Sequence, residues 1–150
     1  MIGPDTVESV VFDTEPLVAH ADGETGADIV TDWLDAVYEG EINGHISTVN
    51  LTEVKYILAR KYSRQDADEY ISWLSEMGIH TIPAGQHWDD AAEWILNYNP
   101  ALGDSYALAT AENTHKTETA LLVGADDDYD DIEADSPKHF VLKRFRTEPA

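Results

Sequence analysis

The stretch Ala101–Ala111, A-L-G-D-S-Y-A-L-A-T-A, decides how the rest of the chain is interpreted. At the period of an α-helix, one face of this stretch carries Asp104, Ala107, Leu108 and Ala111. An ionisable group therefore heads a stripe that should pack inward. Because burying a lone carboxylate is costly, such a group normally acquires a partner, a proton or a metal ion. The plainer interpretation is that Asp104 caps its helix, since Asp suits a helix N-terminus.

The composition indicates one domain and an extreme net charge. The 150 residues, 43% of them hydrophobic, predict a single domain spanning 1–150 with a real core. The chain has 30 Asp and Glu against 9 Lys and Arg, a net charge of −21. A general affinity for polyanions is excluded, because it depends on Lys and Arg. Acidity spread along the whole chain indicates a halophile-like protein. At 1 M salt the Debye length falls to about 3 Å, so repulsion between the surface charges is screened.

Nothing in the sequence indicates export or a membrane. Cysteine is absent, which excludes disulfides and thiolate metal sites and fits the cytoplasm. The N-terminal residues M-I-G-P-D-T-V-E lack the basic and apolar regions of a signal peptide. No apolar run approaches the roughly 18 residues of a membrane span. We therefore expect a cytoplasmic protein.

Strands and helices alternate along the chain. Short apolar runs predict strands at Val7–Phe12, His45–Val49, Ile79–Pro83, Thr119–Val123 and Phe140–Phe145. Helical periodicity predicts helices at Gly23–Glu39, from Asn50 onward, at Arg64–Met77, at Gln86–Asn99, and from Asp104 to about His115. This alternation predicts an α/β fold, a three-layer sandwich with a mostly parallel central sheet flanked by helices.

Four acidic residues stand at places where such a fold binds ligands. Asp13 and Asp126 directly follow predicted strands, and open α/β sheets bind ligands outside the carboxyl ends of their strands. Glu53 and Asp104 lie in the first turns of predicted helices. Each has a structural alternative: Asp13 could cap the segment 16–20, Glu53 could form a capping box with Asn50, and the acidic run 126–131 could be a solvated loop.

If the sheet gathers these four carboxylates, they need a cation or protons. Carboxylates about 4 Å apart repel by roughly 4 kcal/mol per pair at an effective dielectric constant of 20. A set of oxygen ligands without His or Cys favours Mg²⁺ or Mn²⁺.

The order and context of these motifs resemble the PIN-domain family. The similarity is carried by V-V-F-D-T at 10–14, S-T-V-N-L-T-E-V at 47–54, L-G-D-S-Y-A-L-A-T-A at 102–111, and A-L-L-V-G-A-D-D-D-Y at 120–129. It covers Val10 to about Ile132. Within the family, the length and single-domain layout are most similar to the VapC-type toxin ribonucleases of toxin–antitoxin pairs.

The resemblance implies a cytoplasmic, Mg²⁺- or Mn²⁺-dependent endoribonuclease that cleaves RNA phosphodiester bonds with metal-activated water. It implies a small antitoxin as partner and a homodimer. The implied catalytic and metal-binding residues are Asp13, Glu53, Asp104 and Asp126, with Asp128 as the alternative near the last of these and Thr14 as a supporting hydroxyl.

Two positions depart from the family pattern. Gly124 stands where the family often has Thr or Ser shortly before its fourth acid. Glu15 stands where a small polar residue is common, and it could add a carboxylate or face solvent.

The few basic residues fall into two groups. The first comprises Lys55, Arg60, Lys61 and Arg64, the second Lys138, Lys143, Arg144 and Arg146, and Lys116 lies outside both. This grouping predicts RNA backbone contacts by Lys55, Arg60 and Lys61, or a dimer edge; a solvated surface is the alternative.

Two other functions stay open at the level of sequence. A PIN-like fold could serve as a non-catalytic binding or regulatory module, or the chain could be an RNA-maturation nuclease rather than a toxin. The absence of H-E-x-x-H, G-x-S-x-G and P-loop patterns disfavours zinc hydrolases, serine hydrolases and NTPases.

Overall fold

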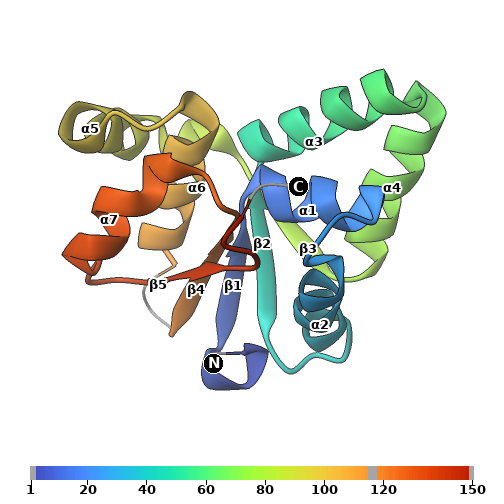
Figure 1. Ribbon diagram of the computed structural model, residues 1–150, viewed down its shortest axis with the longest axis horizontal. Helices are drawn as coiled ribbons and strands as arrows, with labels where there is room; N and C mark the ends of the chain where they lie inside the picture. Colours follow the sequence, from blue (N-terminus) through green and yellow to red (C-terminus); the bar gives the residue numbers. More distant parts are fainter. Residues whose placement is uncertain (1–2, 115–117, 149–150) are drawn as a thin grey trace.

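Five strands form the central sheet of the computed structural model, which describes residues 3–114 and 118–148 (Figure 1). They are β1 (Ser9–Phe12), β2 (Asn43–Ser47), β3 (Ile79–Ile82), β4 (Thr119–Val123) and β5 (Val141–Arg144). The strand order is β3-β2-β1-β4-β5, and every pairing is parallel. The prediction of a mostly parallel sheet is confirmed, and the described strands are parallel throughout.

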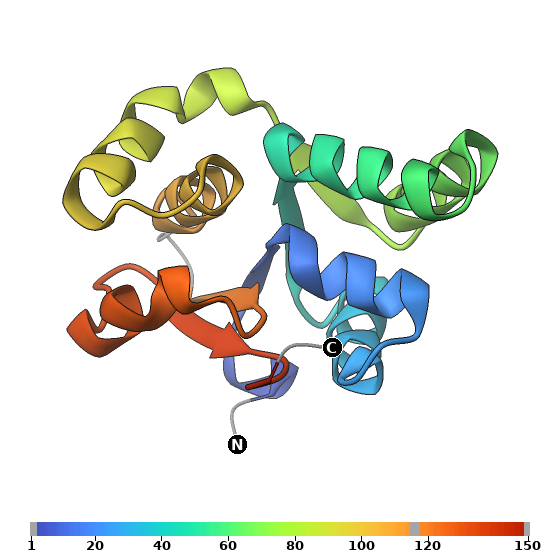
Figure 2. The ribbon, with the colours of Figure 1, turned by 45° about the horizontal axis from the view of Figure 1, so that its top comes forward.

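Helices cover both faces of this sheet. They are α1 (Thr14–Asp22), α2 (Ala27–Tyr38), α3 (Thr48–Lys61), α4 (Arg64–Glu76), α5 (Trp88–Tyr98), α6 (Leu102–Glu112) and α7 (Asp130–Asp135). Helices α1 to α4 lie on one side and α5 to α7 on the other, as the two views show (Figures 1 and 2). The three-layer α/β sandwich is therefore confirmed.

The central strands are buried on both faces, which explains their continuous apolar sequence. Successive side chains of a strand point to opposite faces. Val10 and Phe12 of β1 accordingly pack in the core beneath α1 to α4, while Val11 packs in the core beneath α6 and α7. Ala107 and Leu108 of α6 are fully buried in this second core. The stripe predicted for this helix is thus confirmed.

Several predicted boundaries are wrong by a few residues. The helix predicted from Gly23 begins at Ala27, because Gly23 ends α1 with a left-handed backbone (φ 66°) and Gly26 (φ 86°) separates the two helices. Helix α6 ends at Glu112. His115, the predicted end, lies outside the described residues.

The start of α3 also differs from the prediction. Strand β2 ends at Ser47, whose side chain accepts a hydrogen bond from the Val49 backbone N–H and caps the helix. The alternative in which Asn50 and Glu53 form a capping box is therefore excluded: Asn50 lies inside the first turn, and Glu53 one turn later. Asn50 is fully buried, so its side chain serves a tertiary contact.

The carboxyl ends of β1 and β4 define the position of the site. Strand β1 leads along the chain to β2 on one side, whereas β4 pairs with its other edge. This is a topological switch point, where open α/β sheets bind ligands. Among the described residues, no helix combines the length and apolar character needed to cross a membrane.

Candidate metal centre

A pocket of about 310 Å³ lies at this switch point. Its walls come from the ends of β1 and β4, from α1 and α3, from the start of α6 and from the C-terminal segment. They are formed by Asp13, Thr14, Glu15, Val18, Glu24, Glu53, Ile57, Ala101, Asp104, Asp126 and Arg146. All four acidic residues singled out from the sequence thus face one pocket.

Asp13 is almost fully buried, with 3% of its surface exposed. Its Oδ1 accepts hydrogen bonds from the Thr14 backbone N–H (2.8 Å) and from Asn50 Nδ2 (3.3 Å). Its Oδ2 accepts one from the Tyr129 hydroxyl (2.8 Å). Asp13 therefore caps α1 and also faces the pocket. Burial raises its pKa to about 7; the Thr14 N–H and Tyr129 oppose this shift, and the charge of Glu53 adds to it.

Glu53 is held by the groups that hold Asp13. The Thr14 hydroxyl donates to Glu53 Oε1 at 2.7 Å, and Asn50 Nδ2 lies 3.4 Å from the same oxygen. Asn50 Nδ2 also lies 3.0 Å from the carbonyl oxygen of Gly103, which brings α6 against α3. A Cβ on Gly103 would displace the Glu53 carboxylate, so the glycine leaves the space that this carboxylate occupies.

Asp104 does not cap its own helix. The N-cap of α6 is Ala101, whose own side chain makes no capping hydrogen bond. Asp104 is half-buried, and its Oδ2 is a buried oxygen with no hydrogen-bond partner in the described protein. Burial raises its pKa to about 9, and repulsion from Asp13, Asp126 and Asp128 adds to the shift. An orphaned buried carboxylate oxygen among like charges is a position that a cation would occupy.

Asp126 and Asp128 both approach Asp104. One carboxylate oxygen from each of the three lies within 4.8 Å of the other two. Asp126 Oδ1 accepts a hydrogen bond from the Asp128 backbone N–H (2.9 Å), and Asp128 Oδ2 accepts one from Ala101 N–H (2.9 Å). The acidic run is therefore ordered: it forms a 3-10 turn (Asp127–Tyr129) and the start of α7, and the Asp128 side chain contacts the N-terminus of α6. It presents two carboxylates to Asp104 rather than one.

The two departures from the family pattern form one structural feature. A Cβ on Gly124 would lie 1.9 Å from Glu15 Oε2, so the Glu15 carboxylate fills the space that a Thr or Ser at position 124 would need. Glu15 Oε2 accepts from Ala125 N–H (3.3 Å) and pairs with Arg146 Nη2 (3.1 Å). Arg146 in turn pairs with Glu24 (3.0 Å). Glu15 and Glu24 thus add two carboxylates to the four of the pocket, and both pair with Arg146.

Arginines from the second basic group organise this region internally. Arg144 Nη1 donates to the carbonyl oxygens of Gly124 (2.8 Å) and Asp126 (3.1 Å), and its Nη2 pairs with Asp130 (2.8 Å). It therefore fixes the turn that carries Asp126. The side chain of Arg146 is only 8% exposed.

The basic residues predicted to contact RNA separate into two sets. Lys55 and Arg60 line a different pocket on the outer side of α3. Lys61 instead pairs with Asp22 (2.6 Å) and Glu24 (3.5 Å).

Sequence reasoning missed Asn50 and Tyr129 as site residues. Asn50 lies three residues before Glu53 on the same helix face, a spacing that also suits a capping box. Tyr129 is fully buried although it follows three acidic residues. The signal was present, because an aromatic residue inside an acidic run must either be exposed or turn inward, where its hydroxyl needs a partner.

The donor set fits a hard divalent cation. The ligand atoms that the pocket lining offers to a cation are carboxylate oxygens, and the lining contains no His or Cys. Among the described residues, Asp104 contributes a buried oxygen without a hydrogen-bond partner. Such ligands suit Mg²⁺ and Mn²⁺. Fold and site together define an α/β three-layer sandwich with a carboxylate pocket at its topological switch point.

The chain belongs to the PIN-domain family, whose profile matches residues 10–135. A comparison with curated protein sequences finds no match. Solved structures share the fold at low sequence identity. One is VapBC2 of Rickettsia felis bound to a DNA fragment from its promoter. It shows 13% identity, covering 91% of this chain and 98% of that chain, with a TM-score of 0.59.

Two further structures are similar. A toxin–antitoxin complex from Klebsiella pneumoniae shows 20% identity, covering 80% of this chain and 89% of that chain, with a TM-score of 0.55. VapC20 of Mycobacterium tuberculosis, a sarcin–ricin loop cleaving toxin, shows 11% identity, covering 83% of this chain and 95% of that chain, with a TM-score of 0.61. At these identities the similarity shows the fold.

Proposed function

We propose that this protein is a cytoplasmic endoribonuclease that hydrolyses RNA phosphodiester bonds with Mg²⁺ or Mn²⁺. The proposed ligands are Asp13, Glu53, Asp104 and Asp126, with Asp128 beside Asp126. The observation that carries the proposal is the pair Asp13 and Asp104, which face one pocket while burial raises both pKa values and neighbouring carboxylates add to each shift. A divalent cation would replace the protons that these carboxylates otherwise retain.

The chain's own residues would orient the reaction. A bound metal supplies activated water and neutralises charge on the phosphate oxygens. The Thr14 hydroxyl fixes the rotamer of Glu53, and Asn50 joins Asp13 and Glu53 to α6. Tyr129 directs one oxygen of Asp13 inward, so that the carboxylate keeps one orientation. These contacts would hold the ligands in place before substrate arrives.

Metal-dependent cleavage by variants tests this proposal. We expect Mn²⁺ or Mg²⁺ to support cleavage of an RNA mixture, and EDTA to stop it. Asp13→Asn and Asp104→Asn should each lower the rate by at least roughly a hundredfold, because each removes an anionic ligand. Asp32→Asn removes the same charge from an exposed position on α2 and should leave the rate unchanged. Metal binding without cleavage in the wild-type protein would favour a non-catalytic module instead.

The proposed biological role is that of a toxin neutralised by a small antitoxin. The similar complexes from R. felis and K. pneumoniae are described as VapBC and as toxin–antitoxin, which supports such a partner. We propose that the antitoxin's C-terminal segment covers the carboxylate pocket, with an Arg reaching the carboxylates, and that the protein is a homodimer. Growth arrest by the wild type, but not by Asp104→Asn, and its relief by the product of an adjacent gene would support this role. Cleavage without growth arrest would favour RNA maturation.

A further inference from the structure

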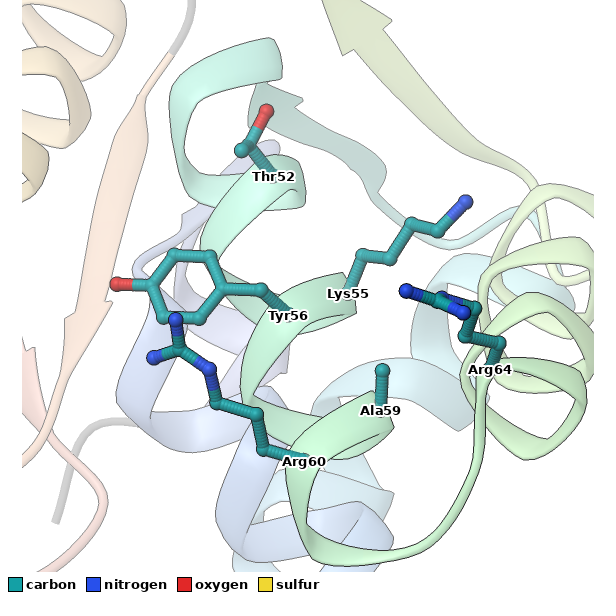
Figure 3. Close-up of a pocket in the computed structure, with 6 residues that line it drawn as sticks. All are labelled: Thr52, Lys55, Tyr56, Ala59, Arg60 and Arg64. Carbon is teal, nitrogen blue, oxygen red and sulfur yellow. The ribbon is translucent and has the colours of Figure 1, made fainter.

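A second, cationic groove lies on the outer side of α3 (Figure 3). It has a volume of about 520 Å³ and is lined by Thr52, Lys55, Tyr56, Ala59, Arg60 and Arg64. Figure 3 shows Lys55 and Arg64 extending into it from α3 and from the start of α4. The Arg60 guanidinium lies over the Tyr56 ring, 4.9 Å from its centroid.

The charges in this groove are available to a ligand. Within the described residues, Arg60 and Arg64 have no carboxylate within ion-pair distance, although the chain has 30 acidic residues. Lys55 pairs with Asp68 at 2.9 Å, but both side chains are more than half exposed, and such a pair is weak. Arg64 is the first residue of α4, where the helix dipole disfavours a cation, so helix stability does not explain it.

Helix α3 contributes residues to both the groove and the carboxylate pocket. Glu53 and Ile57 of this helix line the pocket, and Tyr56 and Arg60 line the groove on the adjacent face. With a rise of 1.5 Å per residue, Glu53 and Arg60 lie about 10 Å apart along the helix axis. A polymer bound at the pocket can therefore reach the groove without leaving the surface of α3.

We propose that a single RNA strand extends from the carboxylate pocket along this groove. Its phosphates contact Lys55, Arg60 and Arg64, and one base stacks on the exposed ring of Tyr56. The protein has a net charge of −21, but this groove is cationic, so charge complementarity favours a polyanion here. An exposed aromatic ring beside arginines is a platform for an unpaired base. The inference rests on the proposed nuclease function. Among the RNA-contacting residues predicted from the sequence, Arg64 takes the place of Lys61, because Lys61 pairs with Asp22 and Glu24.

The salt dependence of RNA binding tests the groove separately from cleavage. The full chain is titrated with a short, unstructured, fluorescent single-stranded RNA in EDTA, so that no cleavage occurs, from about 50 to 200 mM salt. Arg60→Ala with Arg64→Ala should reduce the slope of log K against log salt by about 1.4, since each lost phosphate contact contributes about 0.7. The control, Lys138→Ala with Lys143→Ala, removes the same charge elsewhere and should leave the slope unchanged.

Further variants separate charge, stacking and folding. Arg60→Lys with Arg64→Lys keeps both charges and should retain the wild-type slope. Tyr56→Ala should weaken binding roughly tenfold without changing the slope, whereas Tyr56→Phe should bind as the wild type does. Equal slopes for the two double-alanine variants would overturn the proposal. Loss of a dimer in Arg60→Ala with Arg64→Ala, measured by light scattering, with unchanged RNA binding would also overturn it and assign the groove to a second copy.

The two proposals fail in distinguishable ways. If Arg60→Ala with Arg64→Ala shows the expected slope change in RNA binding but the wild type cleaves nothing with Mn²⁺ or Mg²⁺, the groove stands and the nuclease proposal fails. If it cleaves, and Arg60→Ala with Arg64→Ala cleaves with unchanged KM at every salt concentration, the nuclease stands and the groove fails.

Discussion

Replacing Asp104 with Asn should stabilise the metal-free protein, and increasingly so at higher pH. The folded-state pKa of Asp104 is raised from 3.8 to about 9, so the folded protein retains a proton that the unfolded chain releases. The stability associated with this proton is present below the unfolded pKa and is lost as pH rises toward the folded pKa. Asn keeps the shape of the side chain but carries no charge, and it removes this loss.

The magnitude follows from the pKa difference. Between about pH 5 and about pH 8, the free energy of unfolding falls by 1.36 kcal/mol per pH unit for this one proton, which amounts to ~4 kcal/mol over about three pH units. Asp104 is only half-buried, and solvent at the pocket mouth screens roughly half of this, leaving ~2 kcal/mol. For a chain of this size, that difference raises the melting temperature by about 4–8 °C.

Thermal unfolding in EDTA measures the effect, with Asp32→Asn as the control of equal charge. The gain of Asp104→Asn over the wild type should grow between about pH 5 and about pH 8, while the gain of Asp32→Asn should stay constant. Saturating Mn²⁺ should then stabilise the wild type more than Asp104→Asn, because the cation binds the folded state through this carboxylate. Equal gains for both variants would show that relief of net charge, rather than the local repulsion, causes the stabilisation.

Three further expectations concern the same pocket. Tyr129→Phe removes the hydroxyl that lowers the pKa of Asp13, so the pH midpoint of Mn²⁺ binding, followed by calorimetry, should rise by roughly one unit; an unchanged midpoint would show that this hydrogen bond does not tune the carboxylate. Gly124→Ser should destabilise the chain by about 1 kcal/mol in urea unfolding, because its Cβ would displace the Glu15 carboxylate from Arg146, and Glu15→Ser in the same chain should make the Gly124→Ser change nearly neutral; additive effects would contradict the contact. Mn²⁺ affinity of the wild type should fall as pH drops below about 9, where Asp104 takes up a proton that competes with the cation, and more steeply below about 7, where Asp13 does so too; a pH-independent affinity would exclude both as ligands.

The fold could be predicted from local patterns because each core element carries its own signature. Strand β1 is an apolar run followed at once by Asp13, and α6 has a buried stripe of small residues at helical spacing. The predicted boundaries were less accurate where two capping residues compete. Ser47 and Asn50 both suit an N-cap, and only the length of β2 decides that Ser47 takes this role.

The fine structure of the site could not be predicted, because it depends on pairs distant in sequence. Glu15 and Gly124 each look like an isolated departure, and only their contact shows that the carboxylate fills the space that the glycine leaves. Asn50 gains its role from Gly103, on a helix that packs beside it. Arg146 belongs to the pocket only because β5 carries it past the end of β4. The metal-binding role of the four acids remains a prediction.

Burial, rather than acidity, distinguishes this pocket from the rest of the surface. Acidic side chains occur on nearly every element, yet Asp13 is the one acidic residue that is buried among the described residues. A solvated carboxylate needs no partner, whereas one excluded from water must gain a hydrogen-bond donor, a proton or a cation. Tyr129 and the Thr14 N–H supply donors to Asp13, and Arg146 neutralises Glu15. Within residues 3–114 and 118–148, Asp104 has neither a donor on its buried oxygen nor a basic partner. This unmet requirement makes Asp104 the position at which metal removal should have its largest effect.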